Sequence, residues 1–277
     1  MRGCAYLFAA VVAFQHATPV QAQSRDSVAT AQDSTDPHAA QPERPTVATH
    51  AYTVTPGYVE IEAGIQDAHP SGSSTFAAPI VIKLGVFPRL QLELQSNYSR
   101  AKSAGGEISG VGDFAIALKQ RVLDHAPVLA DFSIQGTIKF ATGAAGVTTG
   151  TTDESILLIS SRQIGAAEID LNAGYTHRSG DGSVAPTSAT LLTASFGVPI
   201  RGGFGAVAET FAYPGTSGLA GTPTSIGFLV GPTLQARPWL VFDAGAILNV
   251  RNLGANAAYA GVTYNAGHIP GFRGHLR

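Results

Sequence analysis

The stretch LQLELQSNY at residues 90–98 decides the fold, because apolar and polar side chains alternate one by one over residues 90–95. Successive side chains of a β-strand point to opposite faces of the sheet. The leucines of this stretch therefore share one face, and the glutamines and the glutamate share the other. Such a strand separates an apolar environment from a polar one.

The same two-residue period recurs along most of the chain. It predicts about twelve strands of roughly ten residues each, which is the length that a tilted strand needs to cross a bilayer. The expected strands are 58–65, 78–86, 90–98, 113–119, 131–140, 154–163, 169–176, 190–200, 204–213, 225–235, 239–250 and 259–269.

The connections between these strands alternate in length. Short turns are expected at 87–89, 124–127, 165–167, 201–203 and 236–238, and longer polar loops at 69–74, 100–110, 142–152, 179–187, 214–224 and 252–257. Outer-membrane barrels have this asymmetry, with tight turns at one end and long loops at the other. The sequence therefore predicts an all-β fold, a closed antiparallel transmembrane β-barrel of about 12 strands.

A soluble β-protein would also alternate apolar and polar faces, with the apolar face as its core. Three features favour the membrane: an export leader, strands of even length, and many small or hydroxyl side chains on the polar face. Aromatic residues near strand ends, as in the girdles of membrane barrels, are expected at Tyr98, Phe140, Tyr175, Tyr213 and Trp239.

The N-terminal region predicts export. Met1 and Arg2 precede an apolar run at 5–14 that is too short to span a bilayer, and a small-residue cleavage pattern ends at Ala22. Residues 1–22 are thus expected to be a signal peptide. Residues 23–50 are rich in Gln, Ser, Thr, Asp, Ala and Pro without any period, and are expected to form a flexible, disordered periplasmic arm, with docking to a partner as the alternative. The barrel is expected over 51–277.

Composition excludes several classes of function. The single cysteine, Cys4, lies in the leader, so the mature chain would have no disulfide, thiolate-bound zinc or thiol nucleophile. A net charge of −2 with 13% charged residues does not fit a nucleic-acid binder. Beyond the leader there is no uncharged apolar run long enough for a transmembrane helix. We expect a monomer whose partners are outer-membrane lipid and a small-molecule solute, with no nucleic acid and no cofactor.

Several segments resemble a family of proteobacterial outer-membrane proteins grouped under the name of the phenol-degradation meta-pathway protein. They are GVGD at 110–113, TIKFATG at 137–143, DLNAGY at 170–175, AETF at 208–211, FDAG at 242–245 and YAGVTYN at 259–265. The resemblance implies a barrel of twelve or a similar number of strands, and a role in the passage of small, often hydrophobic molecules.

Ionisable residues on the polar face are the candidate functional residues, because that face would line the lumen. They are Glu60, Glu62, Lys83, Glu93, Asp113, Lys119, Arg121, Asp131, Lys139, Asp170, Glu209 and Asp243. They could form a charged constriction that selects solutes. Alternatively, opposite charges could pair across neighbouring strands and brace the lumen.

Catalytic and metal sites are not indicated. His125, His177 and His268 stand apart from any nucleophile motif, and no His, Asp or Glu cluster has metal-ligand spacing. Three hypotheses remain. The first is a channel for a small solute, aromatic or apolar in character. The second is a non-conducting barrel whose loops bind a partner, and the third and least favoured is a lipid-modifying barrel enzyme.

Overall fold

A computed structural model describes residues 36–44 and 46–272. The predicted signal peptide and residues 23–35 of the predicted arm lie outside the described residues. No helix in the described ranges is long and apolar enough to cross a membrane.

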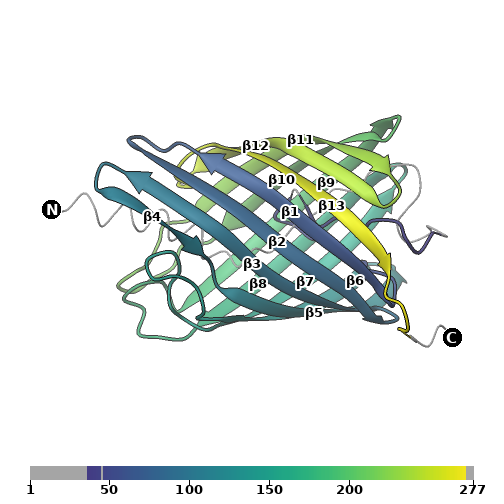
Figure 1. The fold of residues 1–277 in the computed structure, drawn as a ribbon, viewed down its shortest axis with the longest axis horizontal. Helices are drawn as coiled ribbons and strands as arrows, with labels where there is room; N and C mark the ends of the chain where they lie inside the picture. The colour runs from purple at the N-terminus through teal and green to yellow at the C-terminus, as the bar shows by residue number, and fades with distance from the viewer. Residues whose placement is uncertain (1–35, 45, 273–277) are drawn as a thin grey trace.

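Thirteen strands are present in this part of the chain (Figure 1). Their bounds are β1 Tyr58–Ala68, β2 Ser73–Phe87, β3 Leu90–Ser103, β4 Gly106–Val111, β5 Phe114–Ala126, β6 Ala130–Phe140, β7 Asp153–Ile164, β8 Ala167–Arg178, β9 Ser188–Arg201, β10 Phe204–Tyr213, β11 Ser225–Arg237, β12 Leu240–Arg251 and β13 Ala257–His268.

Twelve of these strands form a closed antiparallel barrel. Neighbours in the chain pair with one another, β3 pairs directly with β5, and β13 pairs with β1 to close the ring. Closure leaves no sheet edge and satisfies the backbone groups without water, as a membrane-spanning sheet requires. The predicted fold class, and the even strand number within the ring, are confirmed.

The thirteenth strand, β4, departs from the predicted loop at 100–110. It pairs with the C-terminal part of β3, from Tyr98 to Ser103, in a hairpin that extends beyond the barrel wall (Figure 1). Polar residues such as Arg100, Lys102 and Glu107 occupy this hairpin, so the apolar and polar faces do not contrast. A strand without an apolar face carries no two-residue hydrophobic signal.

The apolar faces of the strands point outward. Ile82, Leu118, Ile156 and Leu171 are 39%, 50%, 48% and 51% exposed, whereas Lys83, Lys119 and Glu93 are fully buried. A soluble barrel would bury the leucines and expose the lysines. The inverted arrangement is that of a barrel whose outer surface faces lipid.

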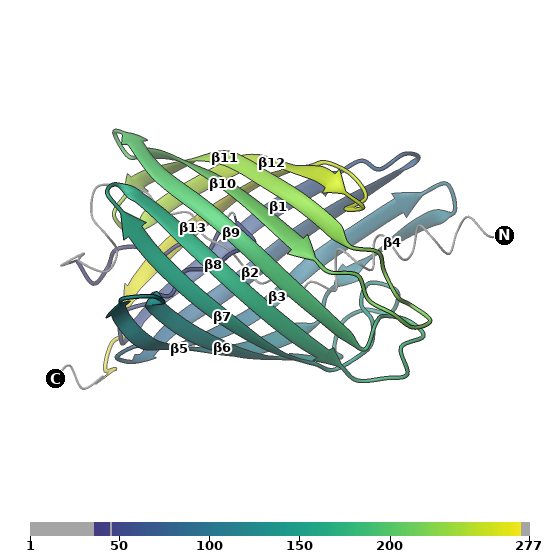
Figure 2. The ribbon, with the colours of Figure 1, turned by 180° about the vertical axis from the view of Figure 1, so that it is seen from behind.

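The two ends of the barrel differ as predicted (Figure 2). The connections after β5, β7, β9 and β11 are short, and we call this the short-turn end; the opposite, long-loop end carries the loops at 141–152, 179–187 and 214–224. Tyr98, Phe140 and Tyr175 are exposed, as girdle residues should be. Tyr213 instead contacts the buried ring of Phe211, which shares its inward face two residues away.

Candidate functional site

The lumen contains a segment of the chain that precedes the first strand. We call residues 36–57 the lumenal segment; residue 45 lies outside the described ranges. Part of it falls within the predicted flexible arm at 23–50, but most of residues 40–54 are buried inside the barrel. Figures 1 and 2 show this segment, in purple, at the end where β13 stops. Polar contacts with the wall hold the segment in place. The composition of residues 23–50 does not reveal such contacts, and so it predicted a flexible arm.

The segment begins at the short-turn end. The His38 ring stacks on Trp239, and its Nε2 lies 2.8 Å from the Asn265 carbonyl oxygen. The Ala40 amide then donates to the Pro238 carbonyl oxygen at 2.8 Å. These contacts fix the segment against the β11–β12 turn and β13.

Carboxylates of the wall accept backbone amides of the segment. The Gln41 amide donates to Glu60 Oε2 at 2.6 Å, and the Glu43 amide donates to Glu62 Oε1 at 2.5 Å. On the far wall, the two carboxylate oxygens of Glu209 accept the amides of Val47 and Ala48 at 2.6 and 2.7 Å. Backbone donors in a buried segment need acceptors, and charged acceptors bind them most strongly.

The segment then returns along the remaining wall. The Thr49 amide donates to Asn172 Oδ1 at 2.6 Å, and the Ala51 amide donates to Ser161 Oγ at 2.8 Å. Further on, the Tyr52 hydroxyl contacts Asp131, and the Val54 amide donates to Gln91 Oε1 at 2.8 Å. The segment has by then contacted β13, β1, β10, β8, β7, β6 and β3, and so it makes a circuit of the interior.

A buried ionic cluster joins the segment to β1, β2 and β5. Lys83 Nζ lies 2.5 Å from Glu60, 2.6 Å from Glu62 and 4.0 Å from Glu43. Lys119 forms an ion pair with the same Glu43 oxygen, which also accepts Gln91 Nε2 at 3.1 Å. Glu43, which belongs to the segment, therefore lies between both lysines of the wall.

The charge of Glu43 depends on these lysines. Burial raises the pKa of its carboxyl, but the ammonium groups of Lys119 and Lys83 outweigh burial and lower that pKa below its ordinary value. Glu43 is therefore ionised at neutral pH, and its charge contributes to holding the segment in place.

Arg44 occupies a seat formed by β1, β12 and β13. Its Nε lies 3.8 Å from Asp243 Oδ2, and its Nη2 lies 3.5 Å from the Ala260 carbonyl oxygen. Gly64 and Gly261 pair across β1 and β13, and a Cβ atom on either one would overlap the Arg44 side chain. The two glycines thus leave the flat space in which the guanidinium lies.

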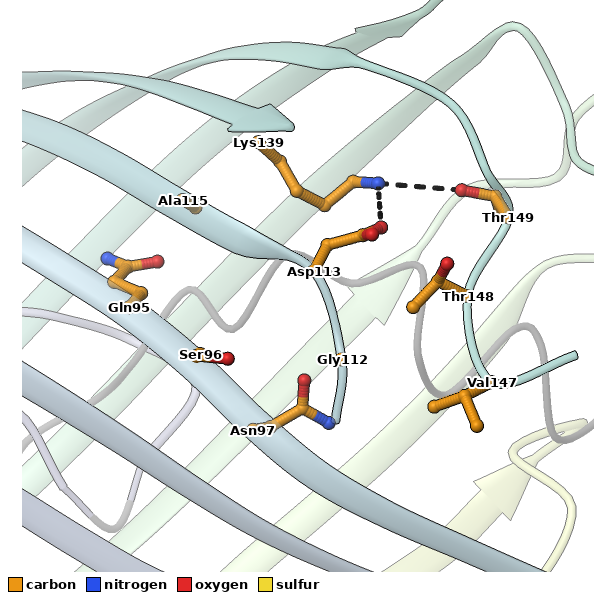
Figure 3. Close-up of a pocket in the computed structure, with 10 residues that line it drawn as sticks. All are labelled: Gln95, Ser96, Asn97, Gly112, Asp113, Ala115, Lys139, Val147, Thr148 and Thr149. Carbon is orange, nitrogen blue, oxygen red and sulfur yellow. Dashed lines mark hydrogen bonds and ion pairs between the residues drawn. The ribbon is translucent and has the colours of Figure 1, made fainter. Parts of the chain in front are cut away.

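A second ionic network lies at the long-loop end, and Figure 3 shows its Lys139–Asp113 pair. Lys139 Nζ lies 2.5 Å from Asp113 and 3.5 Å from Asp153, and Arg178 Nε lies 3.3 Å from Asp153. Asp113 accepts the amides of Thr142 and Gly143. This network fastens the 141–152 loop to the neighbouring ends of β5 and β6, beside a small cavity of about 30 Å³.

All twelve predicted lumen residues have buried or largely buried side chains on the inward face of the wall. Seven of them form ion pairs with one another: Lys83 with Glu60 and Glu62, Lys139 with Asp113, and Arg121 with Asp131. Asp170 instead accepts a hydrogen bond from Ser161 Oγ at 2.5 Å. This pairing agrees with the bracing interpretation. A role in selecting solutes stays a prediction.

Sequence reasoning missed several charged residues of the interior. Asp153, Glu168 and Arg178 share the inward face of β7 and β8, and extending the two-residue period to the strand ends would have found them. With them, the described wall carries ten acidic and five basic inward side chains. Glu43 and Arg44 lie outside any period, so no pattern signalled their place in the lumen.

The three histidines considered from the sequence do not form a site together. His125 and His177 are exposed, and the His268 ring contacts Tyr58. Within the described ranges, no group of three or more His, Cys, Asp or Glu side chains could hold a metal ion.

The barrel is similar to solved outer-membrane channels. An outer membrane channel from Pseudomonas putida F1 superimposes with a TM-score of 0.61 at 13% identity, covering 78% of this chain and 97% of that one. The NanC porin gives 0.51 at 12% identity, covering 74% and 98%. The KdgM porin in complex with disordered oligogalacturonate gives 0.50 at 10% identity, covering 75% and 98%.

At these identities the similarity shows the fold alone, which is that of outer-membrane channel barrels. No protein-family profile matches the chain, and no curated protein sequence matches it significantly. The resemblance to the phenol-degradation family therefore stays a prediction.

Proposed function

We propose that this protein is a gated outer-membrane channel for a small solute with an aromatic or apolar body, and that the lumenal segment closes it. One observation carries the proposal: a separate piece of chain, rather than the wall itself, fills the short-turn half of the lumen. When a removable piece closes the lumen, its departure leaves a path lined by polar side chains.

The contacts of the segment are of a kind that water can replace. They are mainly hydrogen bonds from its backbone to wall side chains, each with a net contribution of about 0.5–1.5 kcal/mol. A single isolated bridge, between Pro56 and Gly85, joins the described part of the segment to a strand by ladder pairing. The segment is therefore not part of the sheet, and its release leaves the ring of twelve strands closed.

A second candidate is a permanently plugged structural barrel. The ion pairs of Lys83 and Lys119 favour it, because breaking a buried pair by removing one partner costs about 3–5 kcal/mol. Release of Glu43 would leave Lys119 with less compensation. The two candidates differ in whether the segment leaves under conditions in which the barrel stays folded.

Conductance in planar bilayers separates these candidates. The full chain and a variant lacking residues 36–50 would be compared with a control shortened in the exposed 214–224 loop. The channel proposal expects rare steps from the full chain, frequent steps from the 36–50 deletion, and steps like the full chain from the control. A folded, inserted deletion variant that conducts nothing would refute the channel.

A further inference from the structure

The Arg44 guanidinium lies in a built site on the barrel wall. Gly64 and Gly261 form its floor, Asp243 faces it at 3.8 Å, and the Ala260 carbonyl oxygen lies 3.5 Å from its Nη2. The residues that surround Arg44 belong to strands of the wall, whereas Arg44 itself belongs to the lumenal segment. The seat therefore remains when the segment leaves. The contact with Asp243 is an ion pair beyond hydrogen-bond distance, and Arg44 Nε has no hydrogen-bond partner among the described residues.

The seat has more acceptor capacity than Arg44 uses. Asp243 Oδ1 and the Tyr259 hydroxyl are buried and have no hydrogen-bond partner among the described residues, and both residues are only 6% exposed. A buried polar atom without a partner costs free energy. A cationic ligand with more than one donor could give Asp243 Oδ1 the partner that it lacks.

The surroundings favour a cation with an apolar body. The inward wall carries twice as many acidic as basic side chains, so removal of the segment exposes an interior with an excess of negative charge. Beside the seat, Tyr259 packs in an apolar cluster with Val207, Leu229 and Ile247. In the closed state Val47 of the segment packs against the same cluster.

We propose that the Arg44 seat is a binding site for an organic cation, a guanidinium or amine carrying a small apolar or aromatic group, which enters when the segment leaves. When the segment is in place, the Arg44 side chain occupies the position of the cationic head of the ligand, and Val47 occupies the position of its apolar body. This inference rests on the proposed channel function, and it specifies that the solute of the channel carries a positive charge.

Block of the open channel tests the site. Methylguanidinium would be added to the variant lacking residues 36–50, with neutral, nearly isosteric methylurea as the control. We expect methylguanidinium to shorten or reduce the current steps and methylurea to leave them unchanged. Asp243→Asn should weaken the block by about tenfold or more, because it removes the charge that the cation faces. Equal effects of the two compounds, or block that survives Asp243→Asn, would overturn the site while the channel stands.

A second measurement keeps the site testable if the deletion variant does not conduct, an outcome that refutes the channel itself. Arg44→Ala in the full chain empties the seat, and methylguanidinium should then raise the thermal unfolding midpoint of the detergent-solubilised protein more than methylurea does. The difference should vanish in Arg44→Ala/Asp243→Asn. No difference in Arg44→Ala would show that the seat binds no free cation, and would overturn the inference.

Discussion

Gly64 and Gly261 show how single residues determine which side chains fit inside the barrel. They face each other across β1 and β13, and the Arg44 side chain lies against both of them. A strand glycine that a side chain approaches this closely has a packing role. From the sequence, both positions read as ordinary small residues of an amphipathic strand, because the group that needs the space lies outside every periodic segment.

Gly64→Val should therefore loosen the lumenal segment. The new side chain occupies the place of the Arg44 guanidinium, and overpacking of this kind costs about 1–3 kcal/mol. We expect faster proteolysis of the segment in the folded barrel. Gly136→Ala is the matched control, since nothing lies within 4 Å of the added Cβ. Equal protection of the segment in both variants would contradict the role of the seat.

Glu43 predicts how the segment responds to acid. Its pKa in the folded protein is lowered from an ordinary value of 4.5, so its contribution to stability is complete above pH 4.5 and is lost as the pH falls through the lowered pKa. The emission of Trp239, the single tryptophan and a stacking partner of His38, reports the transition. We expect a change below pH 4.5, and in Glu43→Gln an acid-like emission already at pH 7. The same acid transition in both proteins would exclude Glu43 as its cause.

At the scale of elements, the two-residue period predicted the ring of strands, because each strand has lipid on one side and the lumen on the other. It missed β4, which has no apolar face, and it placed no structure in residues 36–50. The lumenal segment is held by contacts such as those of Glu209 and Asn172, which lie far from it in the sequence. Side chain to backbone contacts of this kind leave no pattern in the chain that receives them.

Glu209→Ala should weaken the attachment of the lumenal segment to β10. The change leaves the buried amides of Val47 and Ala48 without an acceptor, at a cost of about 1–3 kcal/mol for each unsatisfied group. We expect the variant to stay inserted and to show more frequent conductance steps than the full chain. Glu154→Ala, which changes an exposed glutamate on β7, is the control and should behave like the full chain. If the two variants conduct alike, Glu209 does not hold the segment.

The whole molecule is a closed ring of strands whose interior is filled from two directions. The lumenal segment occupies the short-turn half, and at the other end Lys139 and Asp113, shown in Figure 3, bind the 141–152 loop. The polar faces of the strands predicted a lined interior and all twelve of its expected charged residues. They did not predict that residues 40–54 lie inside the barrel, because that depends on where the chain before the first strand goes.

If the lumenal segment must move for the barrel to conduct, a reversible covalent lock on the segment will control conductance. Ala51→Cys and Ser161→Cys, in a Cys4→Ser background, would place two thiols on residues that are in direct contact, since the Ala51 amide donates to Ser161 Oγ at 2.8 Å. We expect a silent channel after oxidation and conductance steps at the level of the full chain after reduction. Conductance that is the same in the oxidised and reduced states would show that solute passes without movement of the segment, and would contradict gating by the segment.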